Sequence, residues 1–198
     1  MEYLSSYLTK RMIDNHIIAA DDVEYYCYSI QIILERIVCL FAILTLAVVF
    51  RSFVGVFLFL AVFTTIRKRA NGFHCNTSLG CFLVSIIVSI STIPISRVIN
   101  DHCVICVCVV VLSMIVLLII ATFDDPSLYL TAEELIHLKR SSRITVTIIC
   151  FVLISMLLIF PSFRFVSYMT LGVMYNALSL LIAILTERRK KRYDEEKS

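Results

Sequence analysis

Long apolar runs separated by short polar segments make up most of this 198-residue chain. A helix that crosses a bilayer needs roughly 20 mostly apolar residues, because the hydrocarbon core is about 30 Å thick and the helix rises about 1.5 Å per residue. Six runs reach or approach this length. They cover residues 32–50, 53–66, 79–99, 103–123, 144–160 and 165–185. The pattern predicts an all-α, polytopic membrane protein with about six transmembrane helices.

The second run, 53–66, is the shortest, and only Arg51 and Ser52 separate it from the first. As a helix it is roughly 21 Å long. It can cross if the bilayer thins locally, or if the basic residues 67–69 that follow it extend outward to the interface. The alternative is that the first two runs form a re-entrant pair. The sequence leaves both interpretations open.

The first 30 residues are more polar, but their apolar residues recur at helical spacing. The two sets are Leu4, Tyr7, Leu8 and Met12, followed by Val23, Tyr26, Cys27 and Ile30. They predict two amphipathic segments on the inner membrane surface; the alternative is a weakly ordered leader. No signal peptide is expected, because the first apolar run begins only near residue 30. We therefore expect one membrane-embedded domain, with an interfacial arm at 1–30, a six-span bundle at 31–186 and a basic tail at 187–198.

Composition and charge agree with this interpretation. The chain is 60% hydrophobic and 17% charged, whereas soluble domains are about 45–50% apolar and about 25% charged. This excludes a disordered protein, a nucleic-acid-binding domain and a soluble enzyme. With six spans, 15 of the 18 Lys and Arg residues fall on one side, and only Arg51, Arg97 and Arg164 on the other. Because basic loops stay inside, we expect a cell-membrane protein with both termini in the cytoplasm.

Candidate chemistry lies in the segment 67–81, which joins the second and third runs and contains two of the four Gly residues, one His and two Cys. A thiol becomes nucleophilic when a nearby imidazole or helix N-terminus favours the thiolate. In one unbroken helix, His74 and Cys81 would be about 10.5 Å apart along the axis. That separation is too large for proton transfer, so a break between them is required.

The sequence supplies such a break, because Asn76, Thr77 and Ser78 are all favourable N-cap residues. With Ser78 as the cap, Cys81 falls in the first turn of the third span. There the helix dipole and the unpaired backbone N–H groups stabilise a thiolate and an oxyanion. His74, in the preceding bend, could then act as the base. The alternative is a chance spacing in a cysteine-rich chain.

These residues also resemble a known motif. Arg67, Gly72, Phe73 and His74, followed by Cys81, are similar to the accessory gene regulator B (AgrB) family of bacterial membrane cysteine endopeptidases, which process quorum-sensing peptide precursors. The similarity includes the His-to-Cys interval, the Gly two residues before the His and the basic residue seven before it. Exact matching is confined to this segment, whereas the length and the layout of apolar runs are similar over nearly the whole chain.

Two positions depart from the family pattern. Cys75 follows the His where the family more often has a small residue such as Ala, and Asn71 stands where a bulkier residue or a glycine is common. Neither departure changes the His74–Cys81 pair. Cys75 nevertheless leaves a second thiol beside the base, so which thiol reacts stays open.

The resemblance implies a mechanism. The Cys81 thiolate, generated by His74, would attack a carbonyl of a short AgrD-like precursor and form a thioester. An internal Cys or Ser of the precursor would then release a thiolactone or lactone. Gly72 and Arg67 would support the substrate or the oxyanion, or Arg67 would be a membrane-interface anchor. The expected partners are the precursor peptide and membrane lipids, and the sequence is compatible with a homodimer. We expect no nucleic-acid partner, no cofactor and no metal.

A second cysteine cluster supports an alternative. Cys103 and Cys106 form a C-x-x-C pair at the outer start of the fourth run, next to His102. The pair is compatible with a membrane thiol–disulfide oxidoreductase; a metal site there lacks an obvious fourth ligand. The third interpretation is packing, because cysteines such as Cys39 and Cys150 also fill apolar runs.

Two further alternatives are weaker. Glu134 and His137 have the i, i+3 spacing of half a di-iron motif, but no second copy exists. Glu133 and Glu134 are instead typical of the first turn of a solvated helix. A non-enzymatic scaffold or transporter is the last class, and the lack of a carboxylate deep inside any run argues against coupled transport.

Overall fold

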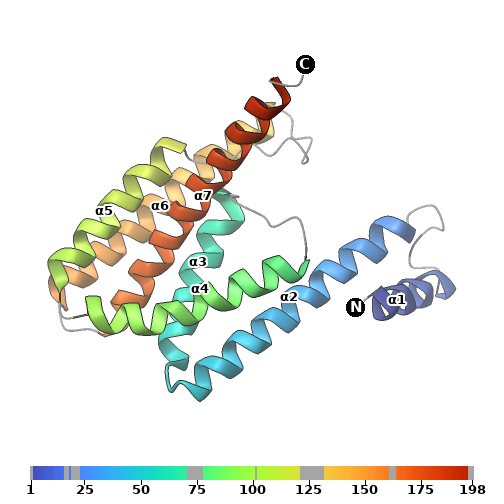
Figure 1. Ribbon diagram of the computed structural model, residues 1–198, viewed down its shortest axis with the longest axis horizontal. Coiled ribbons are helices and arrows are strands. Elements are labelled where there is room, and N and C mark those ends of the chain that lie inside the picture. Colours follow the sequence, from blue (N-terminus) through green and yellow to red (C-terminus); the bar gives the residue numbers. More distant parts are fainter. Residues whose placement is uncertain are drawn as a thin grey trace.

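The computed structural model describes residues 2–15, 18, 23–70, 78–100, 102–120, 132–160 and 164–195. In that part of the chain the regular structure consists of seven α-helices, and no strand is present (Figure 1). They are α1 (Glu2–Asp14), α2 (Val23–Val49), α3 (Phe53–Ala70), α4 (Ser78–Ile99), α5 (Cys103–Ile120), α6 (Ala132–Ile159) and α7 (Val166–Glu195). The prediction of an all-α protein is confirmed.

Five of the described helical segments are long and apolar enough to cross a membrane. They are Val23–Val49, Leu79–Ile99, Cys103–Ile120, Glu133–Ile159 and Val166–Thr186. α3 is not among them, because its 18 residues include the three basic residues 67–69. Large apolar side chains point outward from these helices, including Phe41, Ile119 and Phe151, each more than 70% exposed. An outward apolar surface of this kind is expected in lipid, and the chain is a polytopic membrane protein.

The helix boundaries differ from the expected ones at the end of α7, which continues past residue 185 to Glu195, and at the starts of two other helices. Residues 23–30 are not a separate interfacial segment, since α2 runs through them without a break. Residues 132–143, expected as a solvated helix, continue directly into the fifth apolar run as α6. The physical reason is the same in both cases. Neither α2 nor α6 contains Gly or Pro, so nothing ends the helix where the polarity changes.

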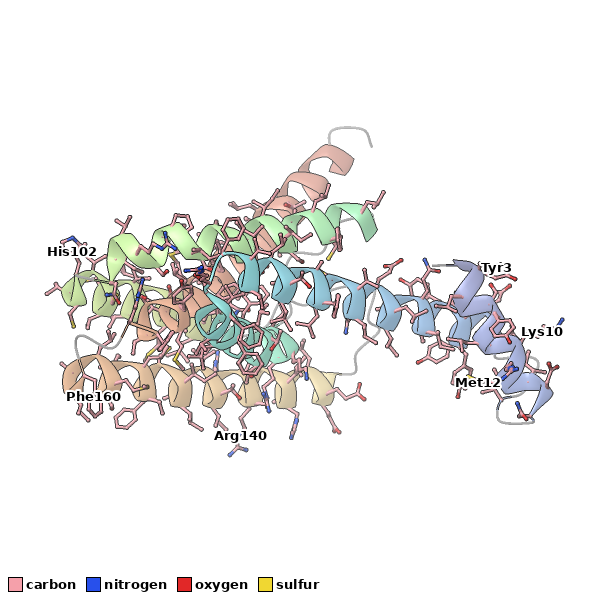
Figure 2. The ribbon with its side chains drawn as sticks, turned by 90° about the horizontal axis from the view of Figure 1, so that it is seen from below. Tyr3, Lys10, Met12, His102, Arg140 and Phe160 are labelled. Atoms are coloured by element: carbon pink, nitrogen blue, oxygen red, sulfur yellow. The ribbon has the colours of Figure 1, made fainter. Side chains whose placement is uncertain are left out.

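Side-chain contacts show which helix ends lie together at each end of the bundle. The thiol of Cys103, at the start of α5, lies 3.6 Å from the carbonyl of Leu157, near the end of α6. At the other end, Arg69 in the last turn of α3 donates to Ser141 in the first half of α6, at 3.0 Å. Figure 2 shows His102 and Phe160 at one end of the bundle and α1 beyond the other.

α3 lies inside the bundle, where it contacts α2, α4, α6 and α7. Its closest partner is α7. The pairs that touch are Gly55 with Tyr168, Phe59 with Gly172, Phe63 with Asn176 and Arg67 with Ser179. Because the residue numbers rise together on both helices, by three or four at each step, α3 and α7 run parallel and in register. We call this row of contacts the α3–α7 seam.

The N-terminal helix α1 packs against the beginning of α2 (Figure 1). Its inner face is polar, since Ser5 and Thr9 are buried and the Ser5 hydroxyl lies 3.5 Å from the Cys27 thiol. Its outer face carries apolar side chains, with Tyr3 88% and Tyr7 48% exposed. The amphipathic spacing predicted for α1 is therefore present, with the apolar side facing away from the protein.

Candidate active site

Cys81 is the fourth residue of α4, so it lies in the first turn of that helix, and it is exposed. The expected location at a helix start is confirmed. The backbone N–H groups of a first turn have no acceptor within the helix and carry the positive end of its dipole. The Ser85 hydroxyl, one turn further on, donates to the Cys81 carbonyl at 2.8 Å. The thiol is therefore accessible and lies at the end of α4 where the helix dipole is positive.

The rest of the predicted pair lies outside the described residues. This concerns His74 and Gly72, together with Asn71, Cys75, Asn76 and Thr77. The described chain ends at Ala70 on one side of this segment and resumes at Ser78 on the other. The pairing of His74 with Cys81 therefore stays a prediction.

Arg67 lies in the last turn of α3, where its half-buried guanidinium donates to the Ser179 hydroxyl of α7. Its neighbour Arg69 donates to Ser141 of α6, whereas the side chain of Lys68 is exposed. Sequence reasoning offered substrate support or a membrane-interface anchor for Arg67. The structure adds a third feature, a contact with another helix. This contact joins residues 112 positions apart in the chain, so no local pattern could have indicated it.

Cys39 of α2 is a neighbour of the candidate nucleophile that sequence reasoning treated only as packing. Its thiol contacts the Ser85 hydroxyl and lies within electrostatic range of the Cys81 thiol. On the same face of α2, one turn earlier, Glu35 accepts a hydrogen bond from Gln31 at 3.1 Å. The packing of α2 on α4 therefore places a second thiol beside Ser85, one turn from Cys81.

Basic side chains gather at the end of the bundle where α3 ends. The Arg69–Ser141 contact places residues 67–69 beside the part of α6 that carries Lys139, Arg140 and Arg143. Figure 2 shows Arg140 pointing away from the bundle. Such a surface attracts anionic lipid headgroups or acidic peptide segments.

The C-x-x-C pair is at the opposite end of the bundle. Cys106 is 2% exposed in the core, and its thiol lies 3.5 Å from the Ile99 carbonyl. The Cys103 thiol faces the Leu157 carbonyl. Neither thiol forms a disulfide, and the same holds for the other cysteines in the described ranges. These contacts favour the packing interpretation of the pair.

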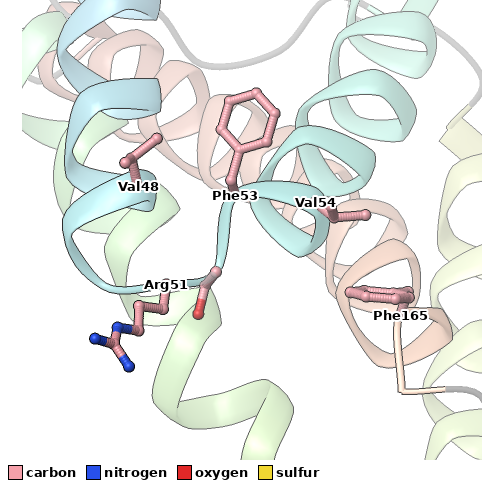
Figure 3. Close-up of a pocket in the computed structure, with 6 residues that line it drawn as sticks. Val48, Arg51, Phe53, Val54 and Phe165 are labelled. Atoms are coloured by element: carbon pink, nitrogen blue, oxygen red, sulfur yellow. The ribbon is translucent and has the colours of Figure 1, made fainter.

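A shallow hollow lies at the turn between α2 and α3 (Figure 3). Val48, Phe53, Val54 and Phe165 line it, and the Arg51 side chain points away from the two aromatic rings. Arg51 has a positive φ of 52°, as the tight turn requires. The hollow contains none of the residues predicted for the site.

These features define a polytopic helical membrane protein with an accessible thiol at the start of one embedded helix and basic side chains at one end of the bundle. A family model described as Accessory gene regulator B matches residues 2–183. The match covers most of the chain, and the protein belongs to the AgrB family. Neither the curated proteins nor the solved structures contain a match. Family membership places the protein in autoinducer-peptide processing, where the family acts on an AgrD-like precursor peptide.

Proposed function

We propose that this protein is a membrane cysteine endopeptidase in which Cys81 is the nucleophile and His74 the general base. The observation that carries the proposal is the exposed Cys81 in the first turn of α4. An embedded helix that starts at the membrane boundary offers its thiol to a peptide on the same surface. Membership of the AgrB family and the seven-residue interval from His74 to Cys81 support the same assignment.

The reaction follows from these groups. His74 takes the proton of the Cys81 thiol, and the thiolate attacks a precursor carbonyl to form a tetrahedral oxyanion near the first-turn N–H groups. The imidazolium then gives its proton to the leaving amine as the C–N bond breaks. The C-terminal part of the precursor departs, and the N-terminal part is held on Cys81 as a thioester.

An internal Cys or Ser of the precursor completes the cycle. Its thiol or hydroxyl loses its proton to His74 and attacks the thioester, and the Cys81 thiolate leaves and is reprotonated. A thiolactone or lactone ring is released. Because a thioester replaces a thioester when the attacking group is a thiol, this exchange costs little free energy. It requires that water be excluded, since hydrolysis would otherwise compete.

Gly72 and Arg67 are proposed as supporting groups. Gly72 lies two residues before His74, where a residue without a side chain lets the backbone approach the substrate closely. The hydrogen bond from Arg67 to Ser179 supports a role in holding the end of α3. The partners we propose are the precursor, anionic lipid and, through lipid-facing helices, a second copy of the chain.

We further propose six spans, with both termini in the cytoplasm. α3 is the span that composition alone does not identify. The support for it is the α3–α7 seam, in which α3 runs beside a candidate span from Gly55 to Arg67. The basic residues 67–69 then mark its inner end, as the positive-inside rule expects.

The thioester tests the proposal directly. A precursor whose internal nucleophile is replaced by Ala can acylate the enzyme but cannot cyclise. Intact-mass spectrometry of the purified protein is expected to show one adduct with the mass of the N-terminal fragment, removed by hydroxylamine and mapped to Cys81. Cys75→Ala and Cys39→Ala are the matched controls and should keep the adduct. An adduct on Cys75, or one that persists in Cys81→Ala, contradicts the assignment.

A further inference from the structure

α7 contacts both helices that flank the segment 71–77, through residues that neighbour one another. The Tyr175 hydroxyl lies 2.6 Å from the Ser91 hydroxyl of α4. The next residue, Asn176, donates through Nδ2 to the Phe63 carbonyl of α3 at 3.1 Å. One helix therefore bonds to the element before the candidate loop and to the element after it.

On the α3 side, the last contact of the seam is the bond from Arg67 to Ser179. Arg67 lies three residues before the end of α3 at Ala70 and seven before His74. A hydrogen bond from a guanidinium is stronger than one between neutral groups, and partial burial protects it from screening. The bond holds the end of α3 at one position along the axis of α7.

On the α4 side, Tyr175 is held from two directions. Its hydroxyl pairs with Ser91, and its ring packs edge-on against Phe59 of α3, with centroids 6.0 Å apart. Ser91 follows Cys81 by ten residues, or about 15 Å along a helix. Both residues belong to α4, and a helix moves along its axis as a unit. A contact that holds Ser91 therefore also limits the axial movement of Cys81.

Asn176 is a buried polar residue in the α3–α7 seam. The side chain is 2% exposed and donates to two carbonyls, those of Phe63 and Gly172. Its Oδ1 atom is buried and has no hydrogen-bond partner among the described residues. A buried acceptor of this kind costs free energy, and a single polar group at a helix–helix contact is an established means of specifying one register.

We propose that Ser179 and Tyr175 of α7 are positioning residues for the reaction, which act through Arg67 and Ser91 and do not touch the substrate. Together they set the distance between the two ends of the segment that carries His74, and thereby its approach to Cys81. This inference rests on the proposed function. It assigns α7 the role of a common support for the base and the nucleophile.

The test uses the full-length protein in lipid nanodiscs and single-turnover acylation by the precursor. Ser179→Ala and Tyr175→Phe are expected to lower the acylation rate by about 10- to 100-fold, since small displacements of reacting groups have effects of this size. Precursor affinity should change little. Ser179→Thr keeps the hydroxyl and should retain the rate. Ser113→Ala, a buried serine of α5 outside the seam, is the matched control and should behave as wild type.

Two readouts separate positioning from a merely structural role. The pH profile of Cys81 alkylation by iodoacetamide should move in Ser179→Ala toward the profile of His74→Ala, and should not move in Ser113→Ala. In a double-mutant cycle, the effect of Ser179→Ala on the rate should be smaller in an Arg67→Lys background, because the two residues share one interaction. If Ser179→Ala fails to fold, Tyr175→Phe carries the same comparison.

Wild-type acylation rates and alkylation profiles in both Ser179→Ala and Tyr175→Phe would overturn the inference, as would strict additivity in the cycle. Failure of the underlying function looks different. If Cys81→Ala still processes the precursor, the nucleophile is wrong, whatever the α7 variants do. If Cys81→Ala is inactive while both α7 variants react normally, only the positioning role fails.

Discussion

Gly55 and Tyr168 show how one residue sets the approach of two helices. A Cβ atom at Gly55 would lie only 2.6 Å from the Tyr168 ring, and Tyr168 is itself buried. At Gly172 a Cβ atom would lie 3.1 Å from the Phe59 carbonyl, which is tight but less severe. Glycine at both positions therefore lets the α3–α7 seam close.

We expect Gly55→Ala to destabilise the protein by about 1–3 kcal/mol, because overpacking forces the ring and backbone to shift. Gly172→Ala should cost less. Thermal unfolding in detergent, followed by loss of monodisperse protein, measures both effects. Val54→Ile adds one carbon at an exposed position of the same helix and is the control. A Gly55→Ala protein as stable as Val54→Ile would show that the helices are not in close contact.

At the same scale, part of the candidate site could be predicted from sequence. The capping residues before Cys81 are local signals, and they correctly indicate a helix start that places Cys81 in the first turn. The contact of Arg67 with Ser179 and that of Cys39 with Ser85 are different. These contacts depend on how each helix is rotated about its axis and shifted along it relative to its neighbour. Hydrophobic periodicity specifies neither quantity.

At the scale of elements, α1 is an amphipathic helix whose apolar side faces away from the protein. Its exposed apolar residues are Tyr3, Leu4, Tyr7 and Leu8. Lys10 and Arg11 follow them, and the Arg11 guanidinium lies 5.6 Å from the centre of the Tyr7 ring. An amphipathic helix with these residues is suited to lie in the headgroup region.

The chain contains no Trp, so one substitution creates a unique fluorophore. We expect the emission of Tyr7→Trp in vesicles to be blue-shifted and quenched by lipids brominated near the headgroup. Ser6→Trp, on the side of α1 that faces Cys27, should be quenched less. Equal quenching at both positions, or water-like emission from Tyr7→Trp, would contradict the interfacial arrangement.

The existence and order of the helices were predictable, but the lengths of α2, α6 and α7 were not. Hydropathy marks the apolar part of a helix, and so it identifies the starts of α3 and α5 and the ends of α4 and α6 to within about one residue. It does not show that a helix continues beyond its apolar part. α2 begins at Val23 and α6 at Ala132 because polar residues there still favour helix and no breaker intervenes.

For the whole molecule, the number of spans decides where the termini lie. Six spans place both termini on one side, whereas the five helices identified by length and composition would place them on opposite sides. The parallel course of α3 and α7 favours six. We expect epitope tags at both termini to be reached by antibody only after permeabilisation of the cells, and a tag between Arg51 and Ser52 to be reached without it. Exposure of a single terminus would contradict the sixth span.

The measurement that tests the central claim most directly is mass spectrometry of a co-expressed precursor. Wild type, Cys75→Ala and Cys39→Ala are expected to yield a shortened peptide, lighter by one further water when cyclised. Cys81→Ala and His74→Ala should leave the precursor intact while reaching the membrane in normal amounts. Processing by Cys81→Ala would contradict the account, because the thiol at the start of α4 would then not be the nucleophile.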